Sequence, residues 1–219
     1  MDIYTRSTAF IDSDAATVSA FARRAAGESP DTRTRAVRLY YAVRDEIRYD
    51  PYSIDLSTEG LRASTTLKNG SGWCVAKAIL LAACCRCMGI AARLGFADVK
   101  NHLSTQRLRQ QMQTDIFYWH GYTAIYAEEK WIKTTPAFNR ELCEKFSLKP
   151  LEFDGKTDSL FHPFDREGNR HMEYILYRGE FADVPLQQIA KTFREKYPAE
   201  KNGWIGGDFD KEADKETGR

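Results

Sequence analysis

Residues 70–74 read Gly70-Ser71-Gly72-Trp73-Cys74 and stand directly before a helix-like pattern of apolar residues. The apolar positions that follow recur at the i, i+3, i+4, i+7 spacing of one buried helix face, and they are Ala76, Ile79, Leu80, Ala83 and Cys87. Glycines ahead of the cysteine suit a tight turn that leads into such a helix. The pattern therefore predicts that Cys74 lies in the first turn of a buried helix.

A cysteine in this position is a candidate nucleophile. The first turn of a helix offers unpaired backbone N–H groups and the positive end of the helix dipole, and both favour the thiolate over the thiol. The thiolate is the reactive form, so we expect Cys74 to titrate well below the ordinary thiol pKa of roughly 8.5. The alternative is a buried structural cysteine, since free cysteine is among the most buried residue types.

A nucleophilic cysteine needs a base, and the chain has four histidines: His102, His120, His162 and His171. His120 is the best placed, because it opens residues 120–126, a run rich in aromatic and β-branched side chains that is typical of a strand. His171 opens a further strand-like run and is expected to be structural. A lone histidine on a strand is also commonly a packed, hydrogen-bonded residue, so both interpretations of His120 stay open on the residue alone.

A second strand-like run, residues 131–135, follows after a short connection and makes a hairpin with the first. If the connection is a two-residue turn at residues 128–129, His120 and Thr135 become diagonal neighbours on one face of the hairpin. A three-residue turn would bring Thr134 to that face instead.

These motifs occur together, in one order, over residues 35–140. They are the helix and its tyrosine-containing end at Val37–Tyr49, Gly72-Trp73-Cys74, Gly89-Ile90-Ala91-Ala92-Arg93, the strand opened by His120, and Trp131-Ile132 followed by Pro136. In this combination the chain resembles the transglutaminase-like superfamily, whose members share a papain-like Cys–His–Asp core. One motif differs slightly, because Ala91 stands where the family has proline. The resemblance implies an α+β fold: a papain-like or transglutaminase-like core in which the nucleophile helix packs on an antiparallel β-sheet.

The third catalytic position departs from the family pattern. The family usually has an aspartate in a tryptophan-containing strand followed by proline, and Thr135 stands at the matching position. A carboxylate there holds the imidazole in one tautomer and stabilises the imidazolium, whereas a threonine hydroxyl can orient the ring but brings no charge. Three alternatives follow. Thr135 orients His120 in a slower enzyme, Asn139 takes the role as amides do in papain-like enzymes, or the site is degenerate and the protein is a binding module.

The resemblance implies acyl transfer on amide bonds. Cys74 would attack an amide carbonyl to form a thioester, with His120 as the base and nearby backbone N–H groups stabilising the oxyanion. Trp73 would either line the acyl-binding site or simply pack in the hydrophobic core. Water would then hydrolyse the thioester, or a second amine would capture it. We favour peptidase- or amidase-like hydrolysis, by analogy with compact bacterial members that lack additional β-domains.

A thiol redox or metal protein is a further class to consider. It would need Cys84 and Cys87, which form a Cys-x-x-Cys pair, to be exposed and reactive. No second cysteine or histidine pair stands at the spacing of a zinc site. We therefore interpret both as small buried hydrophobic residues and expect neither a metal nor a cofactor.

Composition limits the setting and the partners. The 219 residues are 42% hydrophobic and 12% aromatic, which excludes a disordered chain. A net charge of +1 argues against nucleic acid, and the absence of a long apolar run or a signal-peptide pattern argues against a membrane. Five cysteines, an odd number, suit a reduced compartment, so we expect a cytoplasmic protein. The expected partner is a peptide or protein amide substrate, and the oligomeric state is left open.

The chain is interpreted as one domain with extensions. Residues 1–34 form an N-terminal helical extension, residues 35–140 the transglutaminase-like core, and residues 141–207 the C-terminal part of the same domain. In residues 208–219, eight of twelve residues are charged, which predicts a disordered tail.

Overall fold

The computed structural model describes residues 1–101, 104–161, 164–168, 171–198 and 206–217. A four-stranded antiparallel sheet has the strand order β5-β4-β3-β6, and a short parallel pair joins β1 to β2. The strands are β1 (Arg48–Tyr49), β2 (Ser71–Gly72), β3 (Ala92–Asn101), β4 (Ile116–Ala127), β5 (Lys130–Thr134) and β6 (Met172–Phe181). The helices of the described ranges are η1 (Asp2–Tyr4), α1 (Ala16–Ala26), α2 (Thr32–Glu46), α3 (Ala63–Asn69), α4 (Cys74–Cys87), α5 (Gln106–Met112), α6 (Arg140–Lys145), α7 (Leu186–Lys196) and α9 (Phe209–Thr217). This is the predicted α+β architecture.

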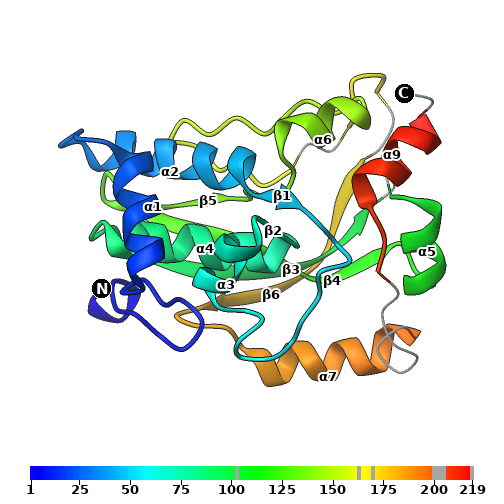
Figure 1. Ribbon diagram of the computed structural model, residues 1–219, viewed down its shortest axis with the longest axis horizontal. Helices are drawn as coiled ribbons and strands as arrows, with labels where there is room; N and C mark the ends of the chain where they lie inside the picture. Colours follow the sequence, from blue (N-terminus) through cyan, green and yellow to red (C-terminus); the bar gives the residue numbers. More distant parts are fainter. Residues whose placement is uncertain (102–103, 162–163, 169–170, 199–205, 218–219) are drawn as a thin grey trace.

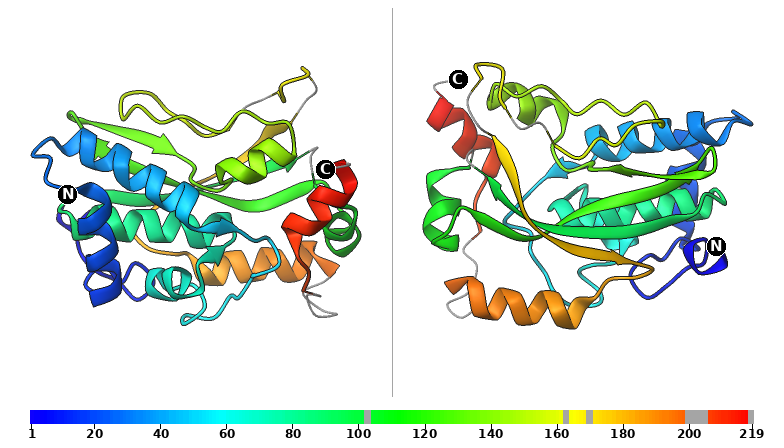
Figure 2. Two further views of the ribbon diagram at one scale, coloured as in Figure 1. Left: turned by 45° about the horizontal axis from the view of Figure 1, so that its top comes forward. Right: turned by 180° about the vertical axis from the view of Figure 1, so that it is seen from behind.

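Helix α4 lies at the centre of the molecule, between the sheet and the helices α1, α2 and α3 (Figure 1). Seen from behind, the sheet lies in front of α4, and β6 forms one of its edges (Figure 2). Every side chain from Cys74 to Arg86 is buried. The spacing predicted one buried face, and the difference arises because three helices cover the side of α4 that faces away from the sheet.

Two cations are buried on α4, where each satisfies backbone carbonyls. Lys77 Nζ donates hydrogen bonds to the carbonyl oxygens of Arg44 and Ile47 at the end of α2. The Arg86 guanidinium donates to the carbonyl of Ala92 at the start of β3. Burial lowers the pKa of Lys77 to about 7. These contacts fix both ends of α4 against its neighbours, since a buried carbonyl without a donor would be costly.

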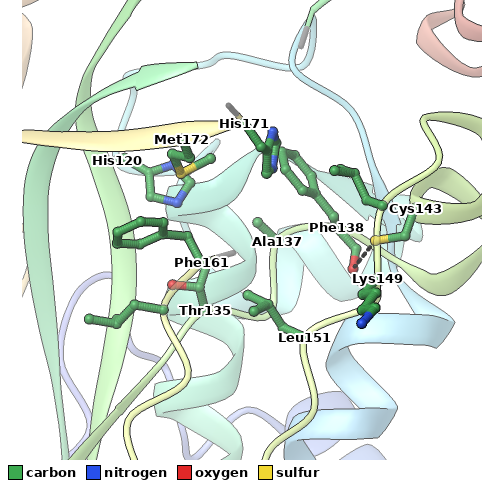
Figure 3. A pocket seen from close by; sticks show the side chains of 12 residues that line it. His120, Thr135, Ala137, Phe138, Cys143, Lys149, Leu151, Phe161, His171 and Met172 are labelled. Carbon is green, nitrogen blue, oxygen red and sulfur yellow. Dashed lines mark hydrogen bonds between the residues drawn. The ribbon is translucent and has the colours of Figure 1, made fainter. Parts of the chain in front are cut away.

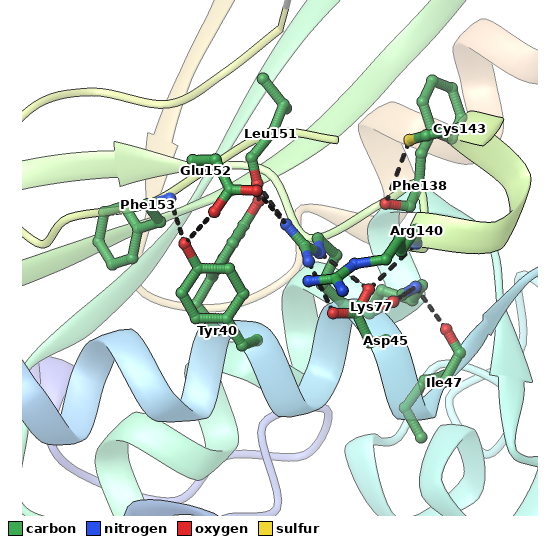
Figure 4. A network of polar contacts seen from close by, with 12 residues as sticks. Tyr40, Asp45, Ile47, Lys77, Phe138, Arg140, Cys143, Leu151, Glu152 and Phe153 are labelled. Carbon is green, nitrogen blue, oxygen red and sulfur yellow. Dashed lines mark hydrogen bonds and ion pairs between the residues drawn. The ribbon is translucent and has the colours of Figure 1, made fainter. Parts of the chain in front are cut away.

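A second polar network ties the end of α2 to the chain that follows β5 (Figure 4). The buried Arg44 donates to the Leu151 carbonyl at 2.6 Å and makes a bidentate pair with Asp45. Asp45 Oδ1 in turn accepts from the backbone N–H of Arg140 at 3.0 Å. The start of α6 is therefore held against α2.

The hairpin of β4 and β5 has the two-residue turn considered from the sequence. Ala127 pairs with Lys130, and Thr123 pairs with Thr134. Glu128 and Glu129, between the strands, both have positive φ, 49° and 65°, as the favoured two-residue hairpin turns require. The register that a three-residue turn would give is therefore excluded.

The expectation of a disordered tail is corrected by the structure. Residues 209–217 form helix α9, which buries Phe209 and Ala213. These residues are four apart and so lie on one face of the helix. The Phe209 ring packs against the rings of Tyr49 and Tyr52. Charge dominated the prediction, but the segment docks through two apolar residues at helical spacing and through ion pairs such as Arg107–Glu212 and Lys145–Asp214. None of the helices in the described ranges is both long and apolar enough to cross a bilayer.

Candidate active site

Cys74 is the first residue of α4, as the sequence predicted, with Trp73 at the N-cap. The approach to it depends on two glycines. Gly70 ends α3 in the left-handed conformation with φ of 63°, which glycine adopts without strain. A Cβ at Gly72 would lie 3.0 Å from the Ala76 Cβ. The Gly-Ser-Gly sequence therefore makes a tight turn that delivers the thiol to the start of the helix.

The thiol is held in the neutral form. Burial raises the pKa of Cys74 to about 11, although backbone N–H groups of Gly121, Val75 and Cys74 itself act in the opposite direction. The sequence predicted a lowered pKa from the helix start alone. The backbone groups do favour the thiolate, but the loss of water around a side chain that is 5% exposed outweighs them.

His120 lies in β4 and is also buried and neutral. Burial, together with the neighbouring His171, lowers its pKa to about 4. Its Nε2 has no hydrogen-bond partner among the described residues. Between pH of about 4 and about 11 the resting site therefore contains a thiol and a neutral imidazole rather than an ion pair.

The residue after His120 brings its backbone to Cys74. A Cβ added at Gly121 would lie 2.9 Å from the Val75 Cα, so only glycine lets β4 lie directly on the first turn of α4. Among the three backbone N–H groups that favour the Cys74 thiolate, the Gly121 amide, which links His120 to Gly121, has the largest effect. Within the described residues, no side-chain hydrogen bond joins Cys74 to His120.

Thr135 lines the same cavity as His120, but no hydrogen bond joins their side chains in the described part of the chain. His120 and Thr135 line one cavity of about 20 Å³, with Phe161 on their side of it and His171 on the other (Figure 3). The Thr135 Oγ1 is buried and has no hydrogen-bond partner among the described residues. A cavity of this size holds about one water molecule.

The other predicted site residues lie elsewhere. Asn139 is buried at the N-cap of α6, where its Oδ1 accepts from the Tyr49 N–H at 3.1 Å. It does not line the His120 cavity. The Trp73 ring packs 5.8 Å from the Phe193 ring, and with Cys74 it lines a separate cavity of about 30 Å³. Two of the four histidines, 102 and 162, lie outside the described residues.

His171 is the residue whose place the sequence did not reveal. It was expected to be structural, yet it lines the same cavity as His120 and lowers the pKa of His120. The residue directly after it opens β6, which pairs with β3, and β3 pairs with β4, which carries His120. No local signal could have found this approach, because it depends on the strand order of the sheet.

The cysteine cluster at the end of α4 is not placed for redox chemistry. Cys84 is completely buried, as predicted, and burial raises the pKa of its thiol. Cys87, the other member of the Cys-x-x-Cys pair, was also expected to be buried but is half-buried, because it is the last residue of α4. No group of three or more His, Cys, Asp or Glu side chains suited to a metal ion occurs within the described ranges.

Comparison with known proteins identifies the family of the chain. The family model of the transglutaminase-like superfamily matches residues 19–136. That is more than half of the chain, and the protein therefore belongs to this superfamily. A solved structure with a similar fold is a "putative cysteine protease" from Cytophaga hutchinsonii, at 17% identity and a TM-score of 0.47. The match covers 61% of this chain and 40% of that one. No curated protein matches the sequence.

Proposed function

We propose that the protein is a cysteine-dependent acyl-transfer enzyme that acts on amide bonds, with hydrolysis as the outcome. The observation that carries the proposal is the contact between the His120–Gly121 amide and the Cys74 sulfur. It brings the backbone of the candidate base to the candidate nucleophile at the start of a helix. Membership of the transglutaminase-like superfamily supports the same pair.

In this mechanism the Cys74 sulfur attacks the carbonyl carbon of the amide while its proton passes to His120. Backbone N–H groups at the start of α4 stabilise the resulting oxyanion. His120 then returns the proton to the departing amine, and the C–N bond breaks to leave a thioester on Cys74. A water molecule, deprotonated by His120, hydrolyses the thioester and releases the acid. Capture by a second amine in place of water would be transglutamination.

The protonation states support general-base catalysis rather than a resting thiolate. A histidine with a pKa of about 4 is unprotonated at neutral pH and so can accept the thiol proton. A thiol with a pKa of about 11 does not give it up unaided. The nucleophile would therefore form only as the substrate enters and replaces the surrounding apolar contacts.

A catalytically weakened binding domain is the second candidate. Two observations favour it: Thr135 stands at the usual aspartate position, and the cavities beside Cys74 and His120 each hold about one or two water molecules. A peptide could reach Cys74 only if the surrounding side chains moved.

Acyl-enzyme trapping separates the two candidates. The protein is incubated with a panel of peptidyl 7-amino-4-methylcoumarin amides, release of the amine is followed by fluorescence, and intact mass spectrometry reports acylation. We expect a thioester on Cys74 that is absent in Cys74→Ala and strongly reduced in His120→Ala. Cys87→Ala, at the other end of α4, is the matched control and should retain activity. Release that persists in Cys74→Ala would refute the mechanism, and a folded protein that is never acylated would favour the binding domain.

A further inference from the structure

Two irregularities in the sheet converge on the buried carboxylate of Asp98. On the β4 side the register shifts between Ala97 and Val99, so that Asp98 alone faces two residues, Tyr118 and Trp119. On the β6 side the register shifts both before and after the Ala97–Asp98 pair. Bulges of this kind bend a strand and re-aim the side chains next to them.

The β4 bulge directly precedes His120. Trp119 has φ of 59°, in the left-handed region that a bulky side chain occupies only when its surroundings hold it there. Such a conformation is strained. The orientation of the His120 side chain therefore depends on the contacts that stabilise the Trp119 backbone.

Both backbone N–H groups of the bulge donate hydrogen bonds to side chains. The Trp119 N–H donates to Asp98 Oδ1 at 3.1 Å, and the Tyr118 N–H donates to the Tyr197 hydroxyl at 2.7 Å. Arg178 holds the Asp98 carboxylate with two hydrogen bonds, Nε to Oδ1 at 3.0 Å and Nη2 to Oδ2 at 2.6 Å. The same guanidinium lies 5.2 Å from the centre of the Trp119 ring. Asp98 is 3% exposed, so these contacts are sheltered from water.

We propose that Asp98, held by Arg178, is a positioning residue that maintains the strained bulge and thereby fixes His120 relative to Cys74. Without the carboxylate, the buried Trp119 amide loses its acceptor, which is unfavourable. We expect the Trp119 backbone then to relax towards an extended conformation, which would rotate the Trp119–His120 peptide and with it the His120 side chain. The proposal rests on the proposed catalytic role of His120, but the geometry that it concerns can be measured without a substrate.

Three variants and one control test the proposal. Asp98→Ala removes both the acceptor of the Trp119 amide and the partner of Arg178, Arg178→Met removes the guanidinium, and Tyr197→Phe removes the hydroxyl that accepts from the Tyr118 amide. Glu46→Gln is the control, because it breaks an exposed ion pair with Arg24, between α1 and α2 and away from the bulge. The pKa of the His120 ring is measured by NMR titration in each folded protein, and kcat and KM are measured on the amide substrate.

We expect the His120 pKa to rise from about 4 by about one unit or more in the three variants, because a loosened bulge admits water to the ring. We expect kcat to fall about 10- to 100-fold with KM nearly unchanged, since small misplacements of a catalytic group have effects of this size. The control should change neither quantity. A folded Asp98→Ala or Arg178→Met protein with the wild-type His120 pKa overturns the proposal. Arg178→Met decides if Asp98→Ala does not fold, and the NMR result stands even if no amide substrate is turned over.

Discussion

Gly121→Ala directly tests the contact between β4 and the first turn of α4. The added Cβ would lie 2.9 Å from the Val75 Cα, 3.1 Å from the Val75 Cγ2 and 3.4 Å from the Val75 N. Two of these are backbone atoms, which cannot rotate away as the end of a side chain can. The strand and the helix must therefore separate, and overpacking of this kind costs about 1–3 kcal/mol.

That cost predicts a fall in melting temperature of about 2–12 °C for a chain of this length, from about 2–4 °C for each kcal/mol. Separation also draws the residue 121 amide away from the Cys74 sulfur, so we expect slower acylation in addition to lower stability. Calorimetry measures the first effect, and mass spectrometry of the acylated protein measures the second.

Gly89→Ala is the matched control for this substitution. Gly89 has φ of 72° and nothing within 4 Å of an added Cβ, so alanine there introduces backbone strain of about 1–2 kcal/mol without a clash. It lies beyond the other end of α4. A Gly89→Ala protein should lose stability and keep its Cys74 chemistry. If Gly121→Ala is as stable and as reactive as the wild type, the close approach of β4 to α4 is refuted.

Three other predictions concern protonation and burial. Thr135→Asp should raise the His120 pKa by about 1–3 units, because a nearby carboxylate favours the imidazolium; an NMR titration that shows no rise contradicts their shared cavity. Alkylation of Cys74 in the resting protein should accelerate about tenfold per pH unit from pH 7 towards its pKa of about 11, and a midpoint below 8.5 would show that burial does not control the thiol. Lys77→Met should lower the free energy of unfolding by about 1–3 kcal/mol, because two buried carbonyls lose their donor; urea unfolding with an unchanged midpoint would contradict this.

The parts of the structure that depend on local spacing could be predicted from the sequence. The start of α4 at Cys74 follows from glycines ahead of an apolar pattern, and the register of the hairpin follows from the length of its turn. Asp31 accepts from the Thr34 N–H at the start of α2, as a helix cap of this type predicts. Each of these features is decided by residues close together in the chain.

The features that sequence reasoning missed depend on distant packing. The full burial of α4 requires three other helices, and the approach of His171 to His120 requires the strand order of the sheet. The bulge at Trp119 is hidden for a different reason: tryptophan gives no signal of positive φ, as glycine would. Its conformation is imposed by Asp98, which lies on another strand.

Thr135 and the protonation state of His120 are linked by the same physical cause. An aspartate in a triad stabilises an imidazolium, but burial and the neighbouring His171 keep His120 neutral here. The His120 cavity is lined largely by apolar side chains, among them Phe138, Phe161 and Met172. A carboxylate placed there would lose its hydration and would itself be costly unless the histidine were charged. Burying a hydroxyl without a partner costs less free energy than burying a charge, so threonine suits a neutral imidazole better than aspartate does. We infer that, with threonine in place of aspartate, the Cys74 thiolate and the His120 imidazolium form only during attack on the substrate and not in the resting site. The Thr135→Asp titration measures how much residue 135 alone contributes to the His120 pKa.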